Sequence, residues 1–240
     1  MEMKKILLSM ILLALCLIQA SADTYYFQIQ LSDENGQPGG WSNYIKVDAV
    51  DNGKVVNGVK QYDYPNGLRT LLNGEAVTDE KKENYYRLPK KAGKVDLDRI
   101  YGIAFTNGKG KGENAQENIM EGDEYEAWKD IRAHIKYLRL REYIRDSYND
   151  DSYFMYMDNV EELELPKDGM KVGNVDDDGI RYFANAYNLK RITIWSTEKN
   201  NSVDITDDAV TDITDKPLLN RVGKFMFSNC YSLSTKYINR

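Results

Sequence analysis

Residues 179–194 read Gly179-Ile-Arg-Tyr-Phe183-Ala-Asn185-Ala-Tyr187-Asn-Leu189-Lys-Arg-Ile192-Thr-Ile194, and the expected fold follows from this segment. Its last six residues follow the pattern apolar-x-x-apolar-x-apolar, which predicts a short strand with one apolar face. The pattern recurs along the chain at irregular spacings of 25 to 44 residues. The copies are Ile100, Ile103 and Phe105; Ile135, Leu138 and Leu140; Val160, Leu163 and Leu165; Leu189, Ile192 and Ile194; and, with a lysine in the middle position, Leu233, Lys236 and Ile238. One such strand cannot bury its apolar face alone, so we expect neighbouring copies to stack and share a core.

The residues before each strand are also related. Gly179 to Leu189 aligns with Gly223 to Leu233 at a constant offset of 44 residues, with identical Gly, Phe, Asn, Tyr and Leu positions. An aromatic residue precedes each of these strands and the two before them; these residues are Trp128, Phe154, Phe183 and Phe227. We expect an aromatic ring from each preceding turn to cover the inward side chains of its strand.

These motifs resemble the BspA-like leucine-rich repeats of bacterial surface proteins. A repeat of that family reads Ile-Gly-x-x-Ala-Phe, then Asn-Cys-x-x-Leu, then a short strand, and Val222 to Leu233 fits it closely. Gly179 to Ile194 also fits, with Ala186 in place of the cysteine, whereas residues 195–221 are longer than the family's repeat allows. The resemblance covers about residues 150–240. It implies an exported solenoid used for attachment or protein recognition, without catalytic residues.

The N-terminal part has a different pattern. Aromatic and β-branched runs at 25–31 and 44–50 are followed by Asn35-Gly36 and Asn52-Gly53, and such pairs predict β-hairpins. We therefore predict a β-rich domain at 23–90 and a leucine-rich-repeat-like domain at 91–240. Residues 123–134 have apolar residues at helical spacing, so a helix there should precede the strand at 135–140. The expected class is α+β, with the β-rich domain followed by a short irregular leucine-rich-repeat-like solenoid.

The first 22 residues predict a cleavable signal peptide. Lys4 and Lys5 precede an apolar run at 6–18, and Ala20-Ser-Ala22 supplies a cleavage site before Asp23. The run is shorter than the roughly 20 residues that cross a bilayer, so we expect no membrane span after cleavage. The protein should be exported to the cell surface, the periplasm or the extracellular space. A formal net charge of −6, without a basic run, disfavours nucleic acid as a partner.

Catalytic and metal-binding patterns are weak. The chain has one histidine, His134, and no catalytic signature surrounds it or Cys230. Residues 174–179 imitate half of a calcium loop, but Asn185 stands where the loop requires a bidentate glutamate. We therefore predict no enzyme activity, no cofactor and no metal. An acidic stretch at 204–215 keeps one alternative open, a secreted carbohydrate-active hydrolase with paired carboxylates.

The residues between the apolar positions should form a second face of the sheet. Parallel pairing would place Arg139 near Glu164 and Glu162 near Arg191, and the alternative to a binding face is a set of surface charge pairs. The predicted binding residues are Tyr137, Arg139, Arg141, Arg191, Trp195 and Tyr237, because Trp, Tyr and Arg often anchor interfaces. We therefore expect an exported binding or adhesion protein of the bacterial cell envelope that recognises an extracellular protein or polysaccharide. A structural envelope subunit that self-associates through its C-terminal edge is the other alternative.

Overall fold

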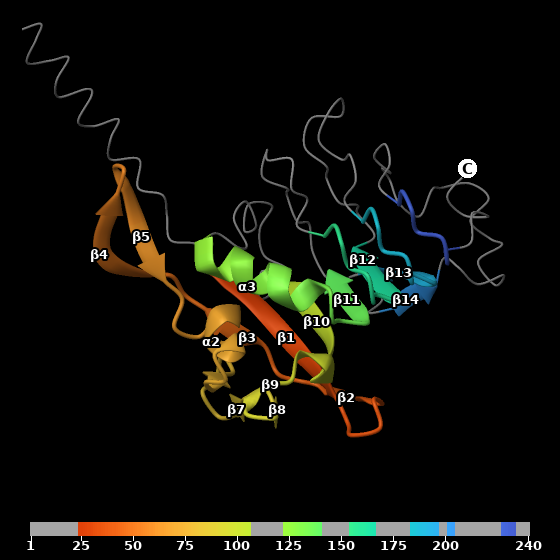
Figure 1. Ribbon diagram of the computed structural model, residues 1–240, viewed down its shortest axis with the longest axis horizontal. Helices are drawn as coiled ribbons and strands as arrows, with labels where there is room; N and C mark the ends of the chain where they lie inside the picture. The colour runs from red at the N-terminus through yellow and green to blue at the C-terminus, as the bar shows by residue number, and fades with distance from the viewer. Residues whose placement is uncertain are drawn as a thin grey trace, which may run out of the picture.

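The computed structural model describes residues 24–106, 122–140, 154–166, 183–196, 201–204 and 227–233. Figure 1 shows a mixed α+β structure with many strands and few helices among these residues, which confirms the predicted α+β class. The predicted signal peptide at 1–22 lies outside the described residues.

One sheet of eight strands organises the molecule. Its order is β14-β13-β12-β11-β10-β1-β2, and β3 also pairs with β1. The strands are β1 (Tyr25–Ser32), β2 (Pro38–Trp41), β3 (Ile45–Val47), β10 (Ile100–Thr106), β11 (Tyr137–Leu140), β12 (Glu162–Pro166), β13 (Arg191–Ser196) and β14 (Asn201–Asp204). Strands β10 to β13 run parallel, whereas β1 is antiparallel to β10, β2 and β3. Strand β14 pairs antiparallel with β13, so the four parallel strands β10 to β13 lie between antiparallel strands on both sides.

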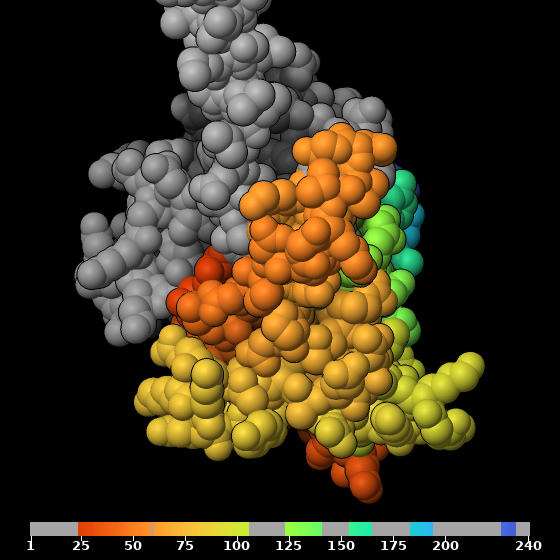
Figure 2. Space-filling model, turned by 90° about the vertical axis from the view of Figure 1, so that its left-hand side faces the viewer, coloured from red at the N-terminus to blue at the C-terminus, as the bar shows by residue number. Residues whose placement is uncertain are grey.

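Smaller elements surround this sheet. They are the hairpins β4 (Val50–Val56) with β5 (Val59–Asp63), β6 (Val77–Thr78) with β7 (Tyr85–Tyr86), and β8 (Lys90–Lys91) with β9 (Lys94–Val95), together with helix α2 (Leu68–Leu72) and the 3-10 turn η1 (Leu97–Arg99). The β4–β5 hairpin projects from the other described elements at the left of Figure 1, and its orange atoms form the uppermost coloured part of Figure 2.

The hairpin predicted at Asn52-Gly53 is wrong. Strand β4 runs through this pair as a bulge, and the chain turns at Asn57-Gly58, where both residues have positive φ. The bulge forms because the side chain of Asp51 accepts a hydrogen bond from the amide of Gly53, and that of Asn52 accepts one from Lys54. The pair Asn35-Gly36 does connect β1 to β2 as predicted.

Helix α3 (Gly122–Arg132) confirms the helix predicted at 123–134, and β11 lies within the strand predicted at 135–140. The buried side of α3 is formed by Ala127, Trp128 and Ile131. The helix therefore covers the apolar face of the sheet, and no helix of the described residues lies on the opposite face of β10 and β11 (Figure 1).

The parallel strands align the apolar positions of the sequence pattern. Ile103 pairs in register with Leu138, Leu138 with Leu163, and Leu163 with Ile192, and all four side chains are buried. This placement agrees with the side-by-side stacking that the pattern predicts. The last copy, at Leu233, Lys236 and Ile238, lies outside the described residues except for the buried Leu233.

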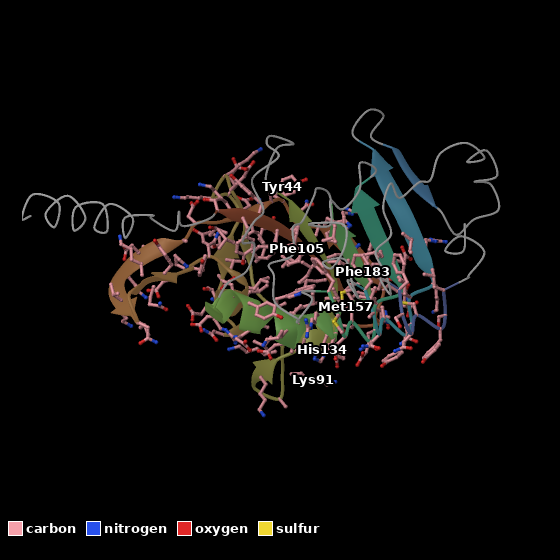
Figure 3. The ribbon with its side chains drawn as sticks, turned by 90° about the horizontal axis from the view of Figure 1, so that it is seen from above. Tyr44, Lys91, Phe105, His134, Met157 and Phe183 are labelled. Carbon is pink, nitrogen blue, oxygen red and sulfur yellow. The ribbon has the colours of Figure 1, made fainter. Side chains whose placement is uncertain are left out.

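A row of aromatic rings runs through the core beneath these strands. Trp128 packs edge-on against Phe105 and Phe154, with ring centroids 5.2 and 5.9 Å away. Phe154 in turn contacts Phe183, which stacks on Phe227 at 5.6 Å. Figure 3 shows Phe105, Met157 and Phe183 in the interior and Lys91 at the periphery. The aromatic residue before each strand thus packs on its neighbour from the next copy.

The turns that carry these rings have a common geometry. The residue two positions after the ring has a left-handed backbone at Tyr156, Asn185 and Asn229, with φ of 60°, 65° and 61°. Asparagine tolerates this conformation better than most residues, which accounts for two of the three positions. The Asn229 side chain also donates a hydrogen bond to the Asn185 side chain at 2.8 Å. Consecutive turns are therefore linked by side chains as well as by packing.

A buried carboxylate joins β1, α2 and α3. Glu124 accepts hydrogen bonds from the Tyr25 hydroxyl and from the backbone amides of Leu68 and Arg69, the latter two at 2.7 and 3.0 Å. Burial raises the pKa of the Glu124 carboxyl despite these donors. Gly67 leaves the space for this carboxylate, because a Cβ there would lie 2.6 Å from Glu124 Oε1.

The domain boundary predicted between residues 90 and 91 falls within β8 and stays a prediction. Strand β1, from the segment before it, pairs along its length with β10, from the segment after it. Side chains from both segments also belong to one hydrophobic core. The two segments therefore contribute neighbouring strands to the same sheet.

A second buried carboxylate fixes the turn between β6 and β7. Asp79 accepts hydrogen bonds from the side-chain amides of Asn84 and Asn43 at 2.6 and 3.1 Å, and from the backbone amide of Glu83 at 2.9 Å. The hydrogen bond from Asn84, followed by those from Asn43 and Glu83, lowers the pKa of Asp79 from 3.8 to about 2.

Replacing Asp79 with asparagine should destabilise the protein at neutral pH, and this loss should shrink between about pH 4 and pH 2. A carboxylate with a lowered folded pKa stabilises the fold above its unfolded pKa, and that contribution disappears as the pH falls through the folded value. Urea unfolding of both proteins at several pH values measures the difference. A difference that stays constant from pH 7 to pH 2 would contradict the assignment.

Candidate binding face

The face of the sheet opposite α3, which we call the outer face, carries a row of polar and aromatic residues. Side chains alternate along a strand, so the positions between the core residues lie on this face. Register pairing places its members side by side across six strands. In order, they are Trp41 of β2, Gln30 of β1, Gly102 of β10, Tyr137 of β11, Glu162 of β12 and Arg191 of β13.

Arg139 occupies the next outward position of β11 and lies at the centre of a compact cluster. Its guanidinium lies over the Trp41 ring, 4.3 Å from the centroid, and 5.2 Å from the Tyr137 centroid. Arg139 Nε lies 3.2 Å from Glu164 Oε2 on the neighbouring strand. The guanidinium is thus held by two aromatic rings and one carboxylate, and the side chain is mostly buried. We call Gln30, Trp41, Gly102, Tyr137, Arg139 and Glu164 together the Trp41 cluster.

Tyr137 connects Arg139 and Glu164 through two hydrogen bonds of its hydroxyl group. Its hydroxyl donates to Glu164 at 2.8 Å and accepts from Arg139 Nη2 at 3.3 Å. Burial and then the charge of Glu164 raise the pKa of Tyr137 to about 12. The phenol therefore stays protonated at neutral pH and keeps its donor. Since Arg139 and Glu164 carry opposite charges, the cluster has no net charge.

Gly102 allows the Trp41 ring to reach across the sheet. A Cβ at Gly102 would lie 2.9 Å from Trp41 Cη2, so any side chain there would displace the indole. The ring instead extends to Tyr137 and packs edge-on against it, with centroids 5.5 Å apart. The short hairpin after β1 and the missing side chain of Gly102 together bring Trp41 onto the outer face.

The outer face becomes more exposed toward β13. Arg191 Nη1 lies 3.8 Å from Glu162 Oε1, and the Arg191 side chain is 50% exposed. Both predicted neighbour pairs, Arg139 with Glu164 and Glu162 with Arg191, are confirmed by the parallel register. The first is a mostly buried pair inside the cluster, and the second is an exposed pair that contributes little to stability.

The structure places the predicted binding residues unevenly. Tyr137 and Arg139 lie together, and Arg191 lies two strands away. The backbone of Trp195 in β13 pairs with that of Pro166 in β12, but the Trp195 side chain is outside the described part of the structure. Arg141 and Tyr237 also lie outside the described residues, as do residues 174–179 of the calcium-like pattern and residues 205–215 of the acidic stretch.

Two other residues singled out in the sequence lie away from the outer face. His134 Nδ1 is 2.9 Å from Asp98 at the end of α3, at the periphery in Figure 3. Cys230 is buried, and burial raises the pKa of its thiol to about 11. The Cys230 Sγ lies 3.2 Å from the Phe183 carbonyl oxygen, so this side chain links two successive turns.

No protein-family model matches this chain, and no curated protein or solved structure matches it either. The resemblance to BspA-like repeats therefore remains an expectation based on the motifs around Phe183 and Phe227. Among the helices of the described ranges, none is both long and apolar enough to cross a membrane. Within the same ranges, no three His, Cys, Asp or Glu side chains gather where they would hold a metal ion.

Proposed function

We propose that this chain is an exported, non-catalytic binding or adhesion protein of the bacterial cell envelope, and that it binds an extracellular protein or glycan through the outer face. The observation that carries the proposal is the arrangement of Trp41, Tyr137 and Arg139. These are the residue types that dominate binding energy at interfaces. Their side chains contact one another and Glu164, which gathers them into one patch on the outer face.

We further propose that residues 91–240 form a short, irregular leucine-rich-repeat-like solenoid of the BspA-like kind. Three features support this proposal: the aligned parallel strands β10 to β13, the continuous row of packed rings from Phe105 to Phe227, and the left-handed turns at Asn185 and Asn229. Stacked units that share a core present a continuous strand face, which suits recognition of a large ligand.

The test of this function is a binding screen with the full chain and its Trp41→Ala variant. Surface plasmon resonance against immobilised matrix proteins and polysaccharides should reveal saturable binding to at least one of them. The Trp41→Ala variant should bind at least tenfold more weakly, because truncating an anchor residue typically costs about 2 kcal/mol or more.

The matched control is Tyr85→Ala, which removes an aromatic ring that is 73% exposed in β7 and belongs to another sheet. This variant should bind as the wild type does. Equal affinity of the wild type and Trp41→Ala would reject the outer face as the binding site. The absence of binding to every probe would reject the function and favour a structural envelope subunit.

A further inference from the structure

Gln30 carries a hydrogen-bond acceptor that no donor in the described residues reaches. The residue is 8% exposed, and its side-chain Oε1 is buried without a hydrogen-bond partner. Its Nε2 donates to the Gly39 carbonyl oxygen at 2.7 Å, which fixes the orientation of the amide. Burying an acceptor without a donor is unfavourable, so Gln30 Oε1 gains from any donor that a ligand brings to it.

This acceptor lies inside the Trp41 cluster. Gln30 is in register between Trp41 on one side and Gly102 on the other. Gln30 Oε1 and Trp41 Cη2 lie 3.2 and 2.9 Å from the position that a Cβ of Gly102 would occupy. The missing side chain of Gly102 therefore creates a place where an aromatic edge and a free acceptor meet.

The chemistry of the cluster favours one class of ligand. It offers an acceptor on Gln30, guanidinium donors on Arg139 and the apolar surfaces of two rings. Because Glu164 compensates the charge of Arg139, an anionic ligand gains little here. An apolar side chain of a protein partner would leave Gln30 Oε1 without a donor. A sugar unit combines hydroxyl donors and acceptors with an apolar C–H surface and carries no charge.

We propose that the Trp41 cluster is a subsite for an uncharged sugar unit of a glycan, in which a sugar hydroxyl donates a hydrogen bond to Gln30 Oε1. This inference rests on the proposed function and names its ligand class. Because Oε1 is covered in the present arrangement, the partly buried Trp41 side chain turns aside to admit the hydroxyl and then packs against the sugar. Binding therefore changes the surroundings of the Trp41 indole.

The first experiment compares the wild type with Gln30→Met, which removes the acceptor and keeps the length of the side chain. The probes are immobilised mannan, dextran and β-glucan, with heparin as a charged polysaccharide and fibrinogen as a protein. The wild type should bind at least one of the neutral polysaccharides, and Gln30→Met should bind it at least tenfold more weakly. Thermal unfolding of the variant, with a midpoint within a few degrees of wild type, verifies that it is folded.

A second measurement uses only proteins with an intact Gln30. Titration of the wild type with the neutral polysaccharide should change its tryptophan emission, and Trp41→Phe should abolish most of this change. Binding to fibrinogen alone would overturn the sugar subsite and leave the proposed function standing, as would binding only to heparin. If Gln30→Met binds the neutral glycan with the wild-type affinity, the sugar subsite is also overturned. The same holds if the wild type binds the glycan without a change in tryptophan emission. Binding to none of the probes counts against both proposals.

Discussion

Replacing Trp128 with alanine should lower the free energy of unfolding by about 3–5 kcal/mol, the range found for large aromatic residues removed from protein cores. The indole is fully buried and packs edge-on against Phe105 on one side and Phe154 on the other. Its removal interrupts the row of rings at the point where α3 meets the parallel strands. Denaturant unfolding monitored by circular dichroism measures the loss.

Two further variants test whether the loss of stability comes from the buried packing of Trp128 or from the removal of any aromatic ring. Trp128→Phe keeps a ring at this position and should lose clearly less stability than the alanine variant. Tyr231→Ala removes a ring that is 78% exposed, and should change the free energy of unfolding by less than about 0.5 kcal/mol. A loss at Trp128→Ala no larger than that at Tyr231→Ala would mean that the helix does not depend on this contact.

Replacing Gly67 with alanine should destabilise the protein by about 3 kcal/mol, although alanine is compatible with the backbone of this residue. Gly67 has φ of −93° and ψ of −172°, which is an ordinary extended conformation. The cost comes from the added methyl group, because both oxygens of the Glu124 carboxylate lie within contact distance of the new Cβ. Moving the carboxylate breaks the hydrogen bonds that it accepts from the backbone amides of Leu68 and Arg69.

The control for this variant is Gly40→Ala in β2, where no atom lies within 4 Å of an added Cβ. Its stability should stay within about 0.5 kcal/mol of wild type. Chemical denaturation at neutral pH gives both values. Equal stabilities of the two variants would show that the Glu124 carboxylate can move aside without loss of stability. The packing of α2 on α3 would then not require a glycine at position 67.

The features predictable from the sequence are those set by local periodicity. The alternation around Ile103, Leu138, Leu163 and Ile192 fixes which side chains face the core, and parallel pairing then aligns them. The spacing of Trp128 and Ile131 likewise marks the buried side of α3. In both cases the pattern lies within a few residues, so no long-range contact is needed to read it.

The missed features depend on contacts between distant residues. Trp41 reaches the outer face because β1 pairs with β10, which joins residues such as Phe27 and Phe105 that lie far apart in the chain. The sequence alone does not show that Gly102 leaves space for the Trp41 ring, because this contact depends on the strand pairing. The error at Asn52-Gly53 has another origin, since Asn57-Gly58 offers the same turn chemistry with valines on both sides. The turn therefore forms where the flanking residues can pair as strands, and the turn residues alone do not determine its position.

The alignment of the parallel strands also determines where the protein tolerates insertions. The parallel strands β10 to β13 start at Ile100, Tyr137, Glu162 and Arg191, so the intervals between them are 37, 25 and 29 residues. The strand register nevertheless stays the same from Ile103 to Ile192. Backbone pairing and ring packing hold each unit in place, so the length of chain between units is free to vary. Evolution, or an engineer, can therefore lengthen these connections and graft new sequences into them without shifting the sheet.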